Sequence, residues 1–177
     1  AYAPGSDADH YASIVGVEKE YRLSKVAKVS AFMYGEDAIR IVYADALAKR
    51  PDVPEESFDL LGANPPYSVK GFLQTLSEDD RVRYDLSRLV SDAAKLNAIE
   101  CFFVERAAQL LKPRGIAAII LPSSILSNGN AVYVRAREIV LESFEVVALA
   151  EFGSGTFGKT GTNTVVAFLH KRDAPPD

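Results

Sequence analysis

An asparagine, two prolines and a tyrosine follow one another at positions 64 to 67, in the segment "LLGANPPYS" that ends an apolar run. Asn64 and Pro65 each precede a proline, which disfavours the α region and holds both residues extended. Pro65 and Pro66 have a fixed φ and no N–H. The loop therefore presents the Asn64 side-chain oxygen and backbone carbonyls without competing donors, and Tyr67 adds a flat aromatic face.

This combination suits a planar ring that carries an amino group. Two acceptors can hold the two N–H hydrogens while the aromatic side chain stacks on the ring. Holding both hydrogens also biases the nitrogen lone pair out of conjugation with the ring, as an attack on an electrophilic carbon requires. A simple turn is the alternative interpretation. It is disfavoured because the loop ends a predicted strand and follows two earlier strands that end in acids.

Two acidic residues end the apolar runs that precede this loop. "SIVGVEKE" (13–20) turns acidic at Glu18, and "IRIVYADAL" (39–47) at Asp45. In an open α/β sheet, ligands lie in the crevice at the carboxyl ends of the strands, where we expect Glu18, Asp45 and Asn64. Glu18 could accept hydrogen bonds from the two hydroxyls of a ribose, and Asp45 from the amino group of an adenine. A solvated strand end is the alternative for either acid alone.

The apolar pattern predicts strands that alternate with helices, which indicates an α/β sheet. Strands are expected in 13–20, 39–47, 57–63, 116–126, 145–152 and 163–171, and helices in 21–36, 98–115 and 131–144. Pro113 and Gly115 are the predicted stop of the second helix. The strand "IAAIILPSSIL" (116–126) is too apolar on both faces for a sheet edge, so we place it centrally. Residues 69–97 mix charges of both signs, and we interpret them as an insertion that is partly helical or mobile.

The predicted helix at 21–36 has an apolar face. That face is broad and consists of Leu23, Val26, Ala27, Val29, Ala31 and Met33. Gly35 is a plausible end for this helix.

The composition is typical of a globular protein in a reducing compartment. Of the 177 residues, 48% are hydrophobic and 25% charged, and no run approaches the roughly 18 apolar residues that would span a bilayer. A secretory leader is not evident. The single cysteine, Cys101, rules out an internal disulfide, and we expect a cytoplasmic location. The helical periodicity around Cys101 predicts a buried core thiol rather than a nucleophile.

The charge balance limits how this chain could bind nucleic acid. A net charge of −4 argues against strong, sequence-independent binding to a polyanion, because phosphate neutralisation supplies most non-specific affinity. If the substrate is nucleic acid, another domain or subunit is expected to supply most of the binding. His10 and His170 are far apart, and no His, Cys and Asp cluster has metal-ligand spacing, so we expect no metal.

Three segments, in this order, resemble the S-adenosylmethionine-dependent N6-adenine DNA methyltransferases of restriction–modification systems: "GANPPY" (62–67), "LKPRGIAAIILPSSIL" (111–126) and "FGKTGTNTVVAFLHK" (157–171). The resemblance covers about 13 to 172 and is closest to type I modification subunits and related fused type II enzymes. It implies a Rossmann-like methyltransferase fold, with a mostly parallel sheet, helices on both faces and one antiparallel C-terminal strand. It also implies S-adenosyl-L-methionine as cofactor and methyl transfer to a flipped adenine of double-stranded DNA.

By this resemblance, Glu18 in "VGVEKE" matches the ribose-binding acid, and Asp45 in "YADAL" matches the residue that contacts the adenine of the cofactor. Asn64 belongs to the cofactor-binding set as well. The glycine-rich cofactor loop that precedes the ribose acid in the family has no counterpart before Ser13. No amphipathic helix follows "EFGSGTFG" (151–158), so we interpret that segment as a connection. We therefore expect a fragment without the first strand and helix, inactive by itself, whose sheet is gapped, rearranged or completed by another chain.

The same resemblance gives the proline-rich loop its role. Asn64, Pro65, Pro66 and Tyr67 match the catalytic loop. Phe157, in "GTFGKTGTNT", matches an aromatic position that helps to hold the flipped base, and Tyr67 would contact that base too. The implied partners are double-stranded DNA, reached through additional domains or subunits, and specificity and restriction subunits.

The expected organisation has three parts: an N-terminal loop at 1–12, a partial methyltransferase domain at 13–172 with an insertion at about 69–97, and a tail at 173–177. Two other functions stay open. Methyltransferases that act on protein glutamine or on guanine amino groups in RNA use a similar "NPPY". A non-catalytic, methyltransferase-like scaffold subunit would fit the lack of a glycine-rich loop.

Overall fold

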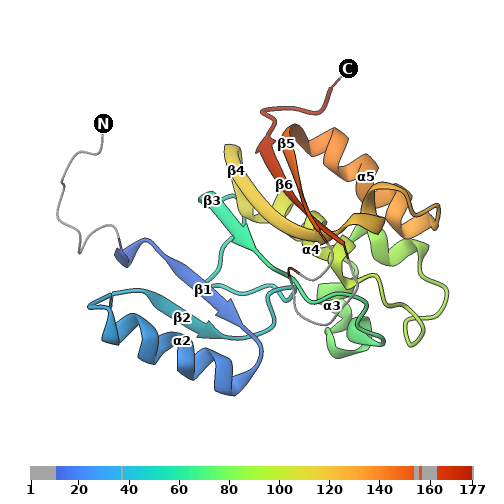
Figure 1. The fold of residues 1–177 in the computed structure, drawn as a ribbon. Coiled ribbons are helices and arrows are strands. Elements are labelled where there is room, and N and C mark those ends of the chain that lie inside the picture. The colour runs from blue at the N-terminus through green and yellow to red at the C-terminus, as the bar shows by residue number, and fades with distance from the viewer. Residues whose placement is uncertain (1–10, 37, 154–155, 157–162, 177) are drawn as a thin grey trace. The chain divides into compact units, whose positions relative to one another are not determined.

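The computed structural model describes residues 11–36, 38–153, 156 and 163–176. The chain divides into two compact units, Ala1–Val53 and Pro54–Asp177. The described strands form two separate sheets, one of two strands and one of four (Figure 1). Both units contain helices and strands, as the alternating apolar pattern predicted.

The first unit is a strand–helix–strand motif. It consists of β1 (Val15–Glu18), α2 (Tyr21–Met33) and β2 (Arg40–Tyr43). β1 and β2 pair in parallel, with Glu18 opposite Tyr43, and parallel neighbours require a crossover, which α2 provides. The side chain of Glu20 caps the helix by accepting a hydrogen bond from the Leu23 backbone N–H at 2.7 Å. Both strands and the helix were predicted from the sequence.

Most of the apolar face predicted for α2 is exposed. The buried residue of this helix is Ser24, whereas Val26 is 62% exposed and Met33 is 77% exposed. The sheet of this unit has two strands of four residues each, which is a narrow surface for a helix of thirteen residues. The apolar pattern therefore predicted the helix correctly, but this unit covers little of its apolar face.

The second unit contains a mixed four-stranded sheet in the order β3, β4, β6, β5. These strands are β3 (Phe58–Ala63), β4 (Leu111–Pro122), β5 (Phe144–Phe152) and β6 (Thr164–Lys171). β3 and β4 are parallel, and β6 runs antiparallel to both of its neighbours, β4 and β5. The antiparallel C-terminal strand is thus β6. β4 lies inside the sheet, as predicted for the most apolar run of the sequence.

One face of this sheet packs against two helices, α4 (Ile99–Leu110) and α5 (Ala131–Ser143), which also contact each other. Side chains on that face, such as Ile119 and Leu169, are almost fully buried. The opposite face carries Leu60, Ile116 and Phe168, which are 70%, 47% and 38% exposed. Strand register places these exposed side chains on one face, since Leu60 pairs with Ile116 and Phe168 pairs with Ala118, two residues further along β4.

The insertion contains three short helical turns. These are η1 (Phe72–Thr75), α3 (Glu78–Arg81) and η2 (Asp85–Leu89). Phe72 and Tyr84 pack against Phe102 of α4, with ring centroids 5.0 and 5.3 Å apart. The prediction of partial helix is therefore confirmed, and the insertion contributes aromatic side chains to the core of the second unit.

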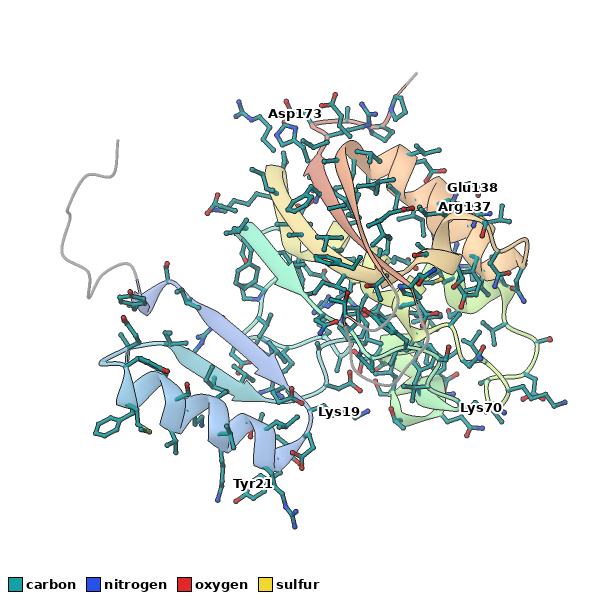
Figure 2. The ribbon with its side chains drawn as sticks, in the orientation of Figure 1. Lys19, Tyr21, Lys70, Arg137, Glu138 and Asp173 are labelled. Carbon is teal, nitrogen blue, oxygen red and sulfur yellow. The ribbon has the colours of Figure 1, made fainter. Side chains whose placement is uncertain are left out.

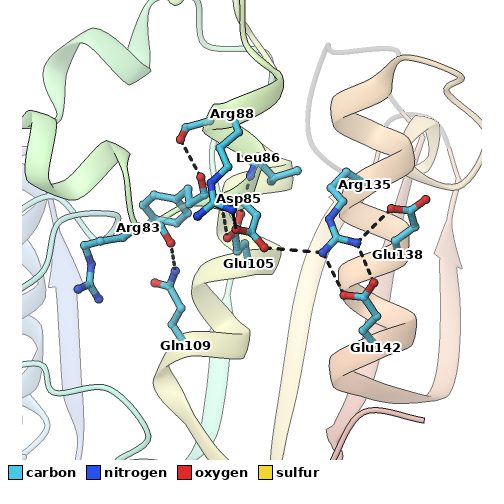
Figure 3. Close-up of polar contacts among 11 residues, drawn as sticks. Arg83, Asp85, Leu86, Arg88, Glu105, Gln109, Arg135, Glu138 and Glu142 are labelled. Carbon is cyan, nitrogen blue, oxygen red and sulfur yellow. Dashed lines mark hydrogen bonds and ion pairs between the residues drawn. The ribbon is translucent and has the colours of Figure 1, made fainter. Parts of the chain in front are cut away.

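Buried polar groups attach the insertion to α4 (Figure 3). The Glu105 carboxylate accepts hydrogen bonds from the backbone N–H groups of Asp85 at 2.6 Å and Leu86 at 3.2 Å. Burial raises the pKa of Glu105, although these two hydrogen bonds act in the opposite direction. Arg135 of α5 pairs with Glu142 at 2.7 Å and also lies 3.7 Å from the Asp85 carboxylate. A charge buried in this way is tolerated because it is hydrogen-bonded.

The boundary between α4 and β4 differs from the prediction. The helix ends at Leu110 and the strand begins at the next residue, so Pro113 and Gly115 lie within β4 and do not stop the helix. The pairing of β3 with β4 shifts register here, and Arg114 has a φ of 65°. A Cβ on Gly115 would lie 3.2 Å from the Phe58 carbonyl oxygen, so the close approach of the two strands favours glycine. Downstream, Ser123–Leu126 form the 3-10 helix η3 instead of extending the strand.

Cys101 is fully buried in α4, which confirms that it is a core thiol. Burial is the main cause that raises the pKa of its thiol, and this disfavours the reactive thiolate. Within the part of the chain that the structure describes, no helix is both long and apolar enough to cross a membrane.

Candidate active site

The proline-rich loop begins directly after β3. Asn64 follows the last residue of that strand and is exposed, as is Pro66, whereas Pro65 is buried and Tyr67 is half-buried. The Tyr67 hydroxyl donates a hydrogen bond to Asn64 Oδ1 over 3.3 Å. An amide oxygen has two lone pairs, so Asn64 can accept a second hydrogen. The Asn64 side chain is therefore accessible, and the hydrogen bond from Tyr67 orients it.

The surroundings of Tyr67 keep its hydroxyl protonated, so that the hydroxyl remains a hydrogen-bond donor. Burial raises the pKa of its hydroxyl, and the negative charge of Glu100 adds to that rise. Tyr67 is thus protonated near neutral pH and can continue to donate to Asn64. For the Pro65 carbonyl, no hydrogen-bond donor is found among the described residues.

Behind the loop lies a buried acid. Ser68 has a φ of 54°, and its backbone N–H donates to Glu100 Oε2 over 3.1 Å. The hydroxyl of Tyr133 donates to the other oxygen, Glu100 Oε1, over 2.6 Å. Glu100 is fully buried, and each of its oxygens accepts one hydrogen bond. The carboxylate thus joins α4, α5 and the residue that follows Tyr67.

The two acids of the first unit lie at one end of its sheet. Glu18 is the last residue of β1, and its carbonyl accepts from the Ala44 backbone N–H over 3.0 Å, next to Asp45. The Glu18 carboxylate accepts a hydrogen bond from the Glu20 backbone N–H over 2.7 Å. The predicted placement of Glu18 and Asp45 at carboxyl ends of neighbouring parallel strands is therefore confirmed.

The Asp45 carboxylate is held by two contacts. Its Oδ1 accepts from the backbone N–H of Leu47 over 3.0 Å, and its Oδ2 lies 2.7 Å from the ammonium of Lys19. Lys19 directly follows β1 and is 57% exposed (Figure 2). A carboxylate has about four lone-pair sites, so Asp45 can still accept from an amino group. The sequence argument did not identify Lys19, although its position next to a strand-end acid was visible.

The chemistry of these donor sets fits parts of a nucleoside. Carboxylates such as Glu18 and Asp45 accept hydrogen bonds from ribose hydroxyls and from the amino group of an adenine ring. In the second unit, Asn64 offers one acceptor for an exocyclic amine and the Pro65 carbonyl offers another. No group of three His, Cys, Asp or Glu side chains with metal-binding geometry occurs in the described part of the chain.

β5 ends at Phe152 and β6 begins at Thr164, and the two strands pair in an antiparallel manner with Phe152 opposite Thr164. The segment 151–158, interpreted from the sequence as a connection, lies partly outside the described residues. Phe157, predicted to hold the target base, lies outside the described residues.

Glu100 and Tyr133 were missed at the sequence level. The available signal was an acid inside a helix that is apolar on nearly every side, "AIECFFVERAAQLL". A charge in such a helix must find partners in the core, and those partners lie far away in the sequence.

Comparison with known proteins identifies the family of this chain. Residues 5–176 match the family model described as N-6 DNA Methylase. The Defense against restriction protein B of Escherichia phage P1 is 24% identical over 150 residues, which cover 85% of this chain and 6% of that protein.

Solved structures show the same fold. A type I restriction–modification methyltransferase subunit from Streptococcus thermophilus is 22% identical with a TM-score of 0.69, over 89% of this chain and 33% of that one. A protein from Listeria monocytogenes described as a class I S-adenosylmethionine-dependent methyltransferase is 15% identical with a TM-score of 0.69, over 92% and 46%. These likenesses establish a Rossmann-like class I methyltransferase fold. This chain spans less than half the length of each of these proteins.

Proposed function

The chain belongs to the N-6 DNA methylase family, and we propose that it carries the catalytic loop of an S-adenosylmethionine-dependent DNA adenine-N6 methyltransferase. The observation that supports this most strongly is the exposed Asn64 side chain, oriented by Tyr67 directly after a strand of the sheet. Asn64, Pro65, Pro66 and Tyr67 form the proposed catalytic loop. In the first unit, Glu18 is the proposed ligand of the cofactor ribose and Asp45 of its adenine.

The loop acts by holding the target amine. Adenine N6 is hidden in a duplex, so the base leaves the stack at a cost of a few kcal/mol. Asn64 Oδ1 and the Pro65 carbonyl then accept the two hydrogens of the exocyclic amine, while the ring of Tyr67 stacks on the base. The bound cofactor supplies a methyl group on a positively charged sulfur. Catalysis by these residues is positioning, which can lower a barrier by about 7–11 kcal/mol.

The reaction balances without an oxidant or a covalent enzyme intermediate. Asn64 and Pro65 would present the N6 lone pair to the methyl carbon that a bound S-adenosylmethionine would supply, and the electron pair of the broken carbon–sulfur bond would leave with the sulfur. The methylated nitrogen would then release one of its two hydrogens as a proton to solvent water. While that hydrogen is in place, the acceptors on Asn64 and Pro65 stabilise the positive charge that develops on the amine.

DNA binding is proposed to depend on more than this chain. With a net charge of −4, the chain lacks the positive charge that supplies most non-specific affinity for phosphates. We propose that additional domains or subunits bind the double-stranded DNA, as specificity and restriction subunits would in a type I or fused type II enzyme.

Replacement of Asn64 tests the function. In the complete gene product, with its partner subunits if it has them, Asn64→Ala is expected to nearly abolish methyl transfer to DNA adenine while the cofactor affinity stays within about threefold, because the change removes one transition-state contact. Labelled methyl transfer and calorimetry measure the two quantities. Asn97→Ala, an exposed asparagine of the insertion, is the matched control and should leave both unchanged. A parallel collapse of cofactor affinity would show that Asn64 supports the cofactor site or the fold and does not act on the amine alone.

The same assay separates the other candidate functions. Wild-type protein is incubated with labelled cofactor and, in turn, with duplex DNA, RNA and protein. Label in RNA or in glutamine side chains, with none in DNA, would replace the proposed substrate. Cofactor-independent assembly on DNA without any methyl transfer would indicate a scaffold subunit.

A further inference from the structure

The catalytic loop has few ways to be fixed through its own backbone. Pro65 and Pro66 have no N–H group, so the stretch after β3 has lost two of its donors. The Ser68 N–H is the next backbone donor after Tyr67, and it is bonded to Glu100 over 3.1 Å. Ser68 also adopts a left-handed φ of 54°, which non-glycine residues rarely hold without support. The Glu100 contact therefore secures the end of the loop at a strained residue.

Glu100 is unusual because a fully buried carboxylate serves this contact. Burying a charge is unfavourable unless hydrogen bonds compensate it, and Glu100 receives one bond on each oxygen, from Ser68 and Tyr133. Burial is the main cause that raises the pKa of Tyr133, followed by its bond to Glu100, so its hydroxyl remains a donor. An apolar residue would fill this space without the desolvation cost, but it could not bind the Ser68 N–H.

We propose that Glu100, held in place by Tyr133, is a positioning residue that fixes the catalytic loop for methyl transfer. Ser68 adjoins Tyr67, and Tyr67 donates to Asn64, so a displacement of Ser68 reaches the group that accepts from the target amine. The inference rests on the proposed function of that loop. A misplacement of about 1 Å can reduce a rate by about 100-fold. Fixing the loop can therefore benefit the rate enough to outweigh the cost of burying the Glu100 carboxylate.

Three substitutions in the complete gene product separate positioning from packing. Glu100→Leu keeps the bulk and removes both acceptors, and we expect kcat to fall about 100-fold with cofactor KM nearly unchanged. Glu100→Gln should restore kcat to within about threefold, because its oxygen can accept from Ser68 while its amide donates to the Tyr133 oxygen. Glu105→Leu is the matched control, since it removes a buried acid of the same helix that binds backbone N–H groups of the insertion.

The comparison of kcat between Glu100→Leu and the control Glu105→Leu separates a positioning role from a structural one. Both leucine variants are expected to lower the melting temperature, but the loss in kcat should be confined to Glu100→Leu. Equal kcat values in the two leucine variants would overturn the inference and leave Glu100 a purely structural residue. If Glu100→Leu does not fold, Tyr133→Phe takes its place: kcat about fivefold lower supports the anchor, since Glu100 loses one of two partners, and an unchanged kcat overturns it.

Amide hydrogen exchange gives a readout that needs no activity. The Ser68 N–H should exchange at least about tenfold faster in Glu100→Leu or Tyr133→Phe, whereas Glu105→Leu should accelerate Asp85 and Leu86 instead. Unchanged exchange at Ser68 overturns the anchor even in an active enzyme. A wild-type protein that methylates no adenine overturns the proposed function, and the role of Glu100 in methyl transfer with it, even where exchange shows that the contact exists.

Discussion

The acids of the first unit and the catalytic loop of the second differ in what lies behind them. Glu18 and Asp45 end a two-stranded sheet, and their contacts are with neighbouring backbone groups and the exposed Lys19. The loop at 64–67 is instead supported by Glu100, a carboxylate that is inaccessible to solvent. The two acids are positioned by strand ends and exposed contacts, whereas the loop is positioned by the core.

The distribution of buried apolar side chains follows the same division. In the described part of the first unit they are Val42, Leu47 and Val53. The second unit has a continuous core that includes Phe102 and Tyr84, both inaccessible to solvent. Two-stranded sheets are marginally stable by themselves, so the packing of the first unit contributes little to holding its acids in a fixed geometry. The core therefore supports the proposed catalytic loop more firmly than the first unit supports the proposed cofactor ligands, Glu18 and Asp45.

The largest expected effect comes from the core of the second unit. Phe102→Ala removes a ring that packs against Phe72 and Tyr84, and it should lower the free energy of unfolding by about 3–5 kcal/mol. Urea unfolding followed by circular dichroism measures this. Leu23→Ala on the exposed face of α2 is the control, with an expected change of about 0.5 kcal/mol or less. Similar losses for both variants would break the comparison, because α2 would then have to be packed.

A second, smaller effect concerns Asp45. In the complete gene product, Asp45→Asn should weaken cofactor binding by about tenfold, which is the loss expected when a hydrogen bond to a charged group becomes a neutral one. Calorimetry with S-adenosylmethionine measures the dissociation constant. Lys19→Ala breaks the ion pair but keeps the carboxylate, so we expect a change within about threefold for this exposed pair. If Lys19→Ala weakens binding more than Asp45→Asn does, the lysine and not the acid is the cofactor ligand.

Much of the fold was readable from the sequence because local patterns determine it. The β-branched run ending at Asp45, the helix of α5 and the central position of β4 follow from apolar periodicity and run length. The start of β4 was not readable. It depends on a register shift against β3 and on the close approach of Gly115 to the Phe58 carbonyl, both of which arise only when the strands pair.

The site was readable to the same limited extent. Asn64, Pro65, Pro66 and Tyr67 follow one another in the chain, so the hypothesis that they hold an amine could be drawn from their types and spacing. Glu100 lies 32 residues from Ser68 and 33 from Tyr133, and no local pattern links them. Exposure of the α2 face was equally invisible, because periodicity identifies an apolar face but not what covers it.

The smallest predicted effect tests how the core tolerates its buried acids. Burial raises the folded-state pKa of Glu105 above its ordinary value of 4.5, despite the hydrogen bonds from Asp85 and Leu86. A raised pKa means that the protonated form stabilises the fold below about pH 4.5 and that this stabilisation is lost as the pH rises through the folded-state pKa. The wild type should therefore lose stability relative to Glu105→Gln between pH 4.5 and 7.

Urea unfolding of both proteins at pH 4.5, 5.5 and 7 measures this difference, with the exposed Glu78→Gln as the control for the change in net charge. The wild type could instead gain stability relative to Glu105→Gln as the pH rises. The two backbone N–H donors would then outweigh the desolvation of the carboxylate, and Glu105 would be a favourable ionised anchor for the insertion. In that case α4 would hold a buried carboxylate favourably through backbone donors, and the contrast between the supported loop and the exposed strand ends would become sharper.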